Sequence, residues 1–113
     1  MSMICVSIMY KDVPDTKFDY DYYVNIHMPK CMKEFKNYGL VRMEVDKGLA
    51  GRGPTIEAPY LCLSRLYFDT YEHFLAAMKA YGRDAFGRIP QFTDVRPKVQ
   101  ISEVVVAVDQ EKT

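Results

Sequence analysis

The chain has 113 residues with 15 basic and 15 acidic side chains, so its formal net charge is zero. With 49% apolar and 27% charged residues, its composition is typical of one small globular domain. Zero net charge argues against a nucleic-acid or anionic-membrane partner, and no apolar run approaches the roughly 20 residues of a membrane-spanning helix.

The first half of the sequence predicts a strand followed by a helix. The strand is Met3–Tyr10, MICVSIMY, and both of its alternating faces are largely apolar, so both are expected to be buried. After a turn at Lys11–Lys17, a helix is predicted to begin at Asp19, whose carboxylate can cap the first turn. The apolar stripe of this helix continues across Pro29, and Gly39 is expected to end the helix as its C-terminal cap.

Two further strands are predicted in the middle of the chain. Leu40–Lys47 alternates between apolar and polar residues and is expected to be half-buried. The glycine- and proline-rich segment Gly48–Pro59 predicts a mobile loop, and it lacks the lysine and hydroxyl pattern of a phosphate-binding loop. The third strand is Tyr60–Phe68, YLCLSRLYF.

The last part of the chain predicts a second helix and a final strand. Asp69, with Glu72 three residues later, forms an N-terminal capping pattern for a helix that extends to about Tyr81. The remaining predicted elements are a short helical piece that stops at Pro90, a crossing segment and the last strand: Arg83–Ile89, Gln91–Lys98 and Val99–Val108.

The predicted order of elements is β-α-β-β-α-β, the ferredoxin-like α+β arrangement of a four-stranded antiparallel sheet with two helices on one face. One domain is expected over residues 3–108, with a disordered tail at 109–113. Because the first, third and last predicted strands are apolar on both sides, the uncovered face would expose a large apolar patch. We therefore expect two copies to pack through this face as a homodimer.

The three cysteines, Cys5, Cys31 and Cys62, lie far apart among apolar residues, with no Cys-x-x-Cys pair. This pattern indicates reduced, buried structural thiols, and a nucleophilic role is disfavoured because nothing nearby would lower a thiol pKa. The N-terminus lacks the charged region and small-residue cleavage site of a signal peptide. We therefore expect a cytoplasmic protein.

His27, one of two histidines, is the first candidate for chemistry. It belongs to the apolar stripe of the first helix and is expected to point toward the sheet. Pro29 cannot donate an amide to the carbonyl of Asn25, so the helix is expected to bend beside His27 and open a cavity. Imidazole suits proton transfer near neutral pH. The alternative is a core histidine with one hydrogen bond, and the residues alone favour that alternative because an isolated histidine is a poor motif.

Three segments resemble EthD-like proteins, the family named after ethyl tert-butyl ether degradation. They are FDYDYYVNIHMP at Phe18–Pro29, FGRIPQFTDVRP at Phe86–Pro97 and QISEV at Gln100–Val104, and the resemblance covers nearly the whole chain. The family belongs to the dimeric α+β barrel superfamily. The resemblance thus implies a homodimer with facing sheets and a pocket between the helices and sheet of each subunit. It also favours His27 as a site residue, since HMP matches the family's most characteristic residues.

The resemblance implies the fold but not one reaction. Relatives with this fold include cofactor-free oxygenases, lactone isomerases, polyketide cyclases, decarboxylases and haem-degrading enzymes. No His-x-x-x-His or paired carboxylate-histidine spacing is present, so no metal site is predicted, and no cofactor is expected. Haem binding through His27 stays open as a hint from the relatives, and nothing in the sequence selects it. His73 is expected to be a solvated surface residue.

Asp94 is the second candidate catalytic residue, because it lies in the irregular segment FTDVRP, where functional residues often occur. It would orient His27 or bind substrate, and the competing roles are an Asx turn or an ion pair with Arg96. Tyr23 and Phe92 are candidates for lining a substrate pocket, with ordinary core packing as the competing role.

Together these features predict a small-molecule catabolic protein that binds a small, largely apolar or aromatic compound beside His27. As an enzyme, it would use His27 as general acid/base in a cofactor-independent oxidation, dehydration, isomerisation or decarboxylation. The alternative is a non-catalytic accessory protein that binds or scavenges a ligand in a degradation pathway. An RNA-binding ferredoxin-like domain is disfavoured, since YLCLSRLYF lacks the required Gly-aromatic pattern and the net charge is zero.

Overall fold

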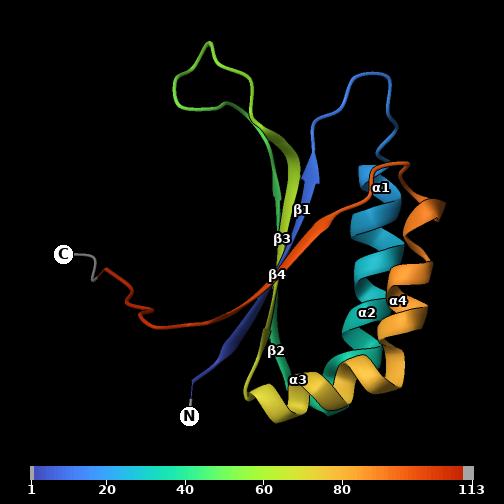
Figure 1. The fold of residues 1–113 in the computed structure, drawn as a ribbon, viewed down its shortest axis with the longest axis vertical. Helices are drawn as coiled ribbons and strands as arrows, with labels where there is room; N and C mark the ends of the chain where they lie inside the picture. Colours follow the sequence, from blue (N-terminus) through green and yellow to red (C-terminus); the bar gives the residue numbers. More distant parts are fainter. Residues whose placement is uncertain (1, 111–113) are drawn as a thin grey trace.

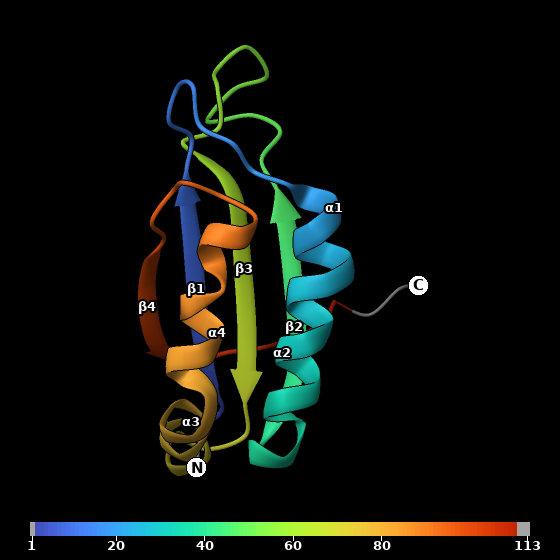
Figure 2. The same ribbon diagram turned by 90° about the vertical axis from the view of Figure 1, so that its right-hand side faces the viewer.

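The computed structural model describes residues 2–110 and consists of one sheet with helices on a single face (Figure 1). The strands pair antiparallel in the order β2-β3-β1-β4. Figure 2 looks onto the helical layer, with α2 in front of the β2 side of the sheet and α4 in front of β1. The predicted ferredoxin-like arrangement is confirmed. The strands are β1 (Ile4–Lys11), β2 (Leu40–Lys47), β3 (Tyr60–Phe68) and β4 (Lys98–Glu103).

The first helical stretch changes its winding three times between Asp19 and Gly39. Asp19 caps it as predicted, because its carboxylate accepts a hydrogen bond from the Tyr22 amide at 3.1 Å. Gly39 ends it with φ of 83°, a left-handed conformation that glycine adopts without strain. In chain order the pieces are α1 (Tyr20–Tyr22), a π-helical turn (Tyr23–His27), α2 (Met28–Phe35) and a 3₁₀ turn (Lys36–Tyr38).

The π-helical turn lies directly before Pro29. The amide of Met28 donates to the carbonyl of Tyr23, five residues back rather than four. Pro29 then occupies the start of α2, where a missing amide donor is tolerated. The helix thus departs from α-helical winding at His27, as expected beside a proline, and it does so by widening one turn. Such wide turns occur frequently at functional sites.

The second helical stretch also contains a π-helical turn, and its start differs from the prediction. Thr70, and not Asp69, is the N-cap: its hydroxyl accepts a hydrogen bond from the His73 amide at 3.1 Å. The Asp69 carboxylate instead contacts His73 Nδ1 at 2.7 Å. Thr70 is the N-cap because its backbone is extended, as this position requires. The pieces are α3 (Tyr71–Ala77), a π-helical turn (Met78–Gly82), α4 (Arg83–Gly87) and a 3₁₀ turn (Ile89–Gln91).

The last strand is shorter than predicted, ending at Glu103 rather than Val108. β4 lies at the edge of the sheet and pairs with β1, which begins at Ile4 opposite Glu103. The Val104 amide still donates to the Met3 carbonyl at 2.9 Å, and beyond it the described backbone has no strand to pair with. The following segment leaves the sheet on the side away from the helices (Figure 1). Within the predicted tail 109–113, Asp109 and Gln110 are exposed and outside any strand, and 111–113 lie outside the described residues.

The core lies between the helices and the inner face of the sheet and is rich in aromatic side chains. Burial of each such side chain contributes about 1.5–3 kcal/mol. The three cysteines are also buried and unpaired, as predicted. Among the described residues, no helix is long and apolar enough to span a membrane. Large side chains with less than 2% exposure in this core include Tyr10, Tyr23, Phe35, Phe68 and Phe92.

The outer face of the sheet, which the helices leave uncovered, is less apolar than the alternation of residues along the strands predicted. Arg65 forms ion pairs with Glu44 at 2.8 Å and Asp46 at 2.7 Å, and Arg42 pairs with Glu44 at 2.5 Å. The Tyr67 hydroxyl donates to the same Glu44 carboxylate at 3.2 Å. The expected apolar patch is therefore interrupted by the polar residues of β2 and β3, which share this face and neutralise one another.

The loop Gly48–Pro59 is expected to exchange its amide hydrogens much faster than β1. Leu49 is 92% exposed, and the hydrogen bonds within the loop are short-range ones between Gly51, Gly53 and Ile56. Loops with few buried contacts open at little cost in free energy. Hydrogen–deuterium exchange with peptide mapping would measure this. Protection equal to that of β1 would show instead that the loop packs against another surface.

Candidate functional site

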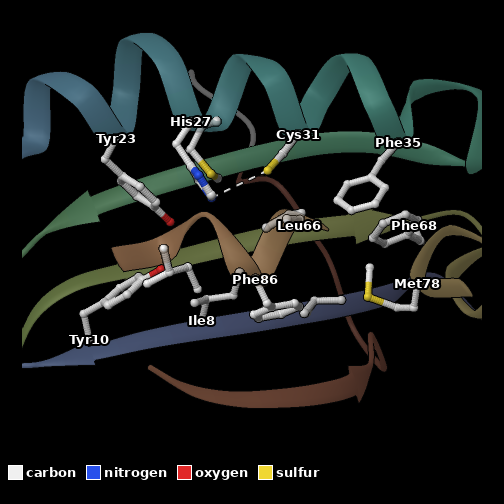
Figure 3. A pocket seen from close by; sticks show the side chains of 14 residues that line it. Ile8, Tyr10, Tyr23, His27, Cys31, Phe35, Leu66, Phe68, Met78 and Phe86 are labelled. Atoms are coloured by element: carbon white, nitrogen blue, oxygen red, sulfur yellow. Dashed lines mark hydrogen bonds between the residues drawn. The ribbon is translucent and has the colours of Figure 1, made fainter. Parts of the chain in front are cut away.

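A small, partly open cavity of about 30 Å³ lies between the first helical stretch and the inner face of the sheet. This volume holds about one water molecule. Figure 3 shows side chains from both layers pointing into it, with His27 and Cys31 on the helix and Tyr10 and Ile8 on β1. The lining is almost entirely apolar and comprises Val6, Ile8, Tyr10, Tyr23, His27, Met28, Cys31, Phe35, Leu66, Phe68, Met78, Ala85, Phe86 and Ile89.

The π-helical turn Tyr23–His27 places the His27 imidazole in this cavity wall. The side chain is 7% exposed, and its ring packs against Tyr23 at 5.6 Å and Phe92 at 4.8 Å between centroids. Nε2 lies 3.6 Å from the Cys31 sulfur. Within the described part of the chain, Nδ1 is buried and has no hydrogen-bond partner. An unsatisfied buried nitrogen costs about 1–3 kcal/mol, so this atom calls for a partner from a ligand or a water molecule.

The His27 imidazole is neutral at neutral pH. Burial, with a smaller contribution from the nearby Arg88 guanidinium, lowers the pKa of His27 from 6.5 to about 4, against the opposing effect of Glu34. A neutral imidazole carries one proton and one lone pair. It can therefore donate or accept a hydrogen bond, or accept a proton, but at neutral pH it does not carry the second proton of a general acid.

The contact between Cys31 and Nε2 fits two tautomers of His27, and each gives Nδ1 a different role. When the thiol donates to Nε2, Nδ1 carries the proton and can donate it to a ligand oxygen. When Nε2–H faces the sulfur, Nδ1 carries the lone pair and can accept a hydrogen bond. Burial raises the pKa of Cys31, although Arg88 opposes the shift, so the thiol stays protonated at neutral pH. The Cys31 thiol is thus a hydrogen-bonding neighbour of His27 and not an activated nucleophile.

Arg88 forms a largely buried ion pair behind Cys31. Its guanidinium donates to the two Glu34 carboxylate oxygens at 2.6 and 3.1 Å, and it lies 3.9 Å from the Cys31 sulfur. The Arg88 and Glu34 side chains are 16% and 14% exposed. Arg88, 57 positions away in the sequence, opposes the rise in the pKa of Cys31, but burial keeps that pKa above its ordinary value, as expected for a structural thiol.

Three of the four predicted site residues lie together. Tyr23 lines the cavity with its hydroxyl 2.6 Å from the Ser64 hydroxyl, and the buried Phe92 packs behind the His27 ring. Asp94 is separate: it is exposed and lines an open groove of about 490 Å³ beside β4. Among the described residues, Asp94 forms no ion pair with Arg96.

Sequence reasoning missed the polar neighbours of His27. His27, Cys31 and Glu34 have the spacing of one helical face, and this signal was available in the sequence. No local signal points to Arg88, which reaches the site only through the packing of the second helical stretch. His73 is exposed as expected, although it pairs with Asp69.

The described residues do not fit a haem. His27 offers a nitrogen ligand, but the cavity of about 30 Å³ is at least tenfold smaller than the usual 300–1,000 Å³ of a ligand pocket. Its apolar lining holds no unpaired cation for the carboxylates of such a group, since Arg88 is engaged by Glu34.

The stability of the protein is expected to fall between pH 6.5 and pH 4 because of His27. Its pKa is about 4 in the folded protein and 6.5 when unperturbed, so the unfolded chain binds the proton first. The contribution is present above pH 6.5 and is lost as the pH falls, by up to about 3 kcal/mol. Urea titrations at several pH values would measure this loss. It should shrink in His27→Leu, and an equal loss in that variant would assign it to other groups.

The chain is similar to several solved structures, although it matches no protein-family model and no curated protein. An EthD-like protein from Ralstonia eutropha JMP134 is 35% identical, with a TM-score of 0.86 over 94% of this chain and 95% of that one. SnoaB from Streptomyces nogalater, a cofactor-independent oxygenase, is 6% identical over 97% and 100%, with a TM-score of 0.66. A dimeric ferredoxin-like protein from an uncultured marine organism is 17% identical over 96% and 100%, with a TM-score of 0.57.

Proposed function

Because this chain belongs to the EthD-like family, we propose that it binds a small, largely apolar or aromatic molecule in the cavity beside His27. The observation that carries the proposal is the buried Nδ1 of His27, which has no partner among the described residues in an otherwise apolar wall. A ligand with an apolar body and one oxygen would fill the space and complete this hydrogen bond. The cavity must widen to admit it.

As an enzyme, the protein would use His27 in a cofactor-independent step of a catabolic reaction. The neutral imidazole suits accepting a proton from the ligand or donating a hydrogen bond to its oxygen, and either role stabilises charge that develops during the reaction. Protein atoms alone supply this chemistry. The likeness to a cofactor-independent oxygenase concerns the fold, and it leaves oxidation, dehydration, isomerisation and decarboxylation as candidate steps.

The second candidate is an accessory protein that binds the ligand without converting it. The placement of the two predicted catalytic residues favours this alternative. His27 lines the cavity, whereas Asp94 lies in a different groove and cannot assist His27 there. In that case His27 serves only as a hydrogen-bond partner. Unpaired cysteines suit the reducing cytoplasm, where we place the protein in either role.

The test is a binding and turnover screen with ethyl tert-butyl ether, small lactones and 1-naphthol. Binding is measured as a rise in melting temperature, and turnover as new products by mass spectrometry without added cofactor. Ala85→Leu should abolish binding because Ala85 lines the cavity, whereas Ala76→Leu on the exposed side of α3 should not. Binding with turnover supports the enzyme, and binding alone supports the accessory protein. Binding that survives Ala85→Leu would contradict the cavity as the site.

We also propose that two copies pair through the outer sheet face and the segment after β4. Val105, Val106 and Val108 are 81%, 76% and 83% exposed, a run of apolar side chains that a second chain would cover. The ion-paired cluster of Arg42, Glu44, Arg65 and Asp46 has no net charge, so two copies of this face would not repel each other.

Sedimentation at micromolar concentration is expected to give twice the 13.1 kDa mass of one chain. An obligate interface would bury about 2,000 Å² or more. Val106→Asp should shift the protein toward the monomer, because it places a charge in the apolar contact. Val13→Asp, at an exposed valine in the loop after β1, is the matched control and should stay dimeric. A single 13.1 kDa species for the unmodified chain would rule out the pairing.

A further inference from the structure

The cavity beside His27 and the wider groove beside β4 are neighbours that share two wall residues, Phe86 and Ile89. The cavity has about 30 Å³ and the groove about 490 Å³. The groove is bordered by Asp94 and Arg96, so it offers polar groups of both signs next to an apolar interior. A ligand that reaches His27 from this side must pass the side chains that separate the two spaces.

Phe86 is the more movable of the two shared residues. It is 36% exposed, and it lies on α4, a helix of five residues that ends in Gly87. A Cβ atom added to Gly87 would meet nothing within 4 Å, so the backbone beside Phe86 has free space. Figure 3 shows the Phe86 ring on the side of the cavity opposite His27, between Ile8 and Met78.

Ile89, by contrast, is held in place. It is 8% exposed, and its carbonyl accepts hydrogen bonds from the amides of Phe92 at 3.0 Å and Thr93 at 3.2 Å. The sheet side of the cavity is equally fixed, because Val6 and Leu66 are paired within the sheet and almost fully buried. Rotation of the Phe86 ring is therefore the smallest change that joins the cavity to the groove.

We propose that Phe86 is the residue that controls entry from the groove to His27 and limits the size of the ligand that reaches it. The ligand would slide its apolar part past the displaced ring and leave its polar end near Asp94 and Arg96. This gives the predicted residue Asp94 a place at the entrance rather than beside the imidazole. The inference rests on the proposed binding cavity, and it can be tested without knowing the natural ligand.

One competing route exists on the other side of α2. Met28 lines both the cavity and a second surface groove of about 250 Å³, which also includes Met43 and Val45. Met28 is 4% exposed, whereas Phe86 is 36% exposed, so entry past Met28 requires movement of a side chain that is packed into the core. Shortening each residue in turn separates the two routes.

The experiment measures how fast diethyl pyrocarbonate, a small reagent that acylates neutral imidazole, modifies His27. The chain has two histidines, and the exposed His73 serves as an internal reference in every sample. Peptide mass mapping gives the ratio of the two rates. We expect Phe86→Ala to raise the His27-to-His73 ratio by about tenfold or more and Phe86→Trp to lower it. Tyr71→Ala, which removes an exposed aromatic side chain from α3, should leave the ratio unchanged.

Three results would overturn the proposal. The first is an unchanged ratio in Phe86→Ala, and the second is a larger rise in Met28→Ala. The third is general loosening of the protein, which labelling of thiols with methyl methanethiosulfonate reveals. Local entry exposes Cys31 in the cavity, while Cys62, fully buried and outside the cavity lining, stays protected. Equal labelling of both thiols in Phe86→Ala would assign the effect to unfolding. If no compound in the binding screen binds, these ratios still report the route, so the two proposals fail separately.

Discussion

His27→Leu is expected to abolish turnover or ligand binding while leaving the protein as stable as before. A proton-transfer group typically contributes a factor of about 10²–10⁴ to a rate. The same substitution removes a buried nitrogen that lacks a partner, so the apolar replacement relieves a desolvation cost while losing the weak bond to Cys31. The free energy of unfolding should therefore change by less than about 1 kcal/mol at neutral pH.

The matched control is His73→Leu, since His73 is exposed and lies outside the cavity lining. Rates or affinities are measured with whichever compound the screen identifies, and stability is measured by urea titration of the same samples. A His27→Leu protein that loses about 1–3 kcal/mol of stability yet binds and turns over normally would identify His27 as a core residue. Lost binding without any turnover in the parent protein would identify the accessory function.

Arg88→Met is expected to destabilise the protein by about 3–5 kcal/mol, because it leaves the Glu34 carboxylate unpaired in a largely buried position. Unfolding in urea would give the value. Combining Arg88→Met with Glu34→Leu should recover much of the loss, since the isolated charge is then gone. The single variant Arg88→Met should also raise the pKa of His27, because the positive charge of Arg88 is one cause of the low pKa of His27.

Arg42→Met provides the control for this second result. Arg42 also pairs with a glutamate, Glu44, but its side chain is 65% exposed, and such surface pairs contribute about 0–1 kcal/mol. A loss in Arg88→Met no larger than that in Arg42→Met would show that water reaches the Glu34 site. NMR titration of the two histidines would follow the pKa of His27 separately from that of His73.

The sequence predicted the fold well because its main signals are local. Alternating strands, the Asp19 cap and the Gly39 terminus depend on neighbouring residues, and the structure has all of them. Thr70 was missed because two capping residues stand side by side, and the choice between them depends on the backbone. The length of β4 was missed because a strand needs a partner, and β1 begins opposite Glu103.

The candidate site was predictable only in part. The helix face that carries the site could be found from the spacing of His27, Cys31 and Glu34. The structure places Tyr23 and Phe92 near His27, in agreement with the proposed pocket. Arg88 and Phe86 come from a distant segment, and only the packing of the two helical stretches against each other and the sheet brings them to the cavity. The wide turn at Tyr23–His27 was also not predicted, since proline indicates a disturbed helix without indicating its form.

The wide turns at Tyr23–His27 and Met78–Gly82 have a consequence for how proteins of this kind diverge. Relative to an α-helix, each turn contains one extra residue, and one residue corresponds to about 100° of rotation around the helix axis. A single-codon deletion or insertion in either turn would therefore rotate one part of a helix relative to the other and leave the strands untouched. Because both turns contribute residues to the lining of one cavity, that lining can be exchanged by gaps in an alignment as well as by substitutions.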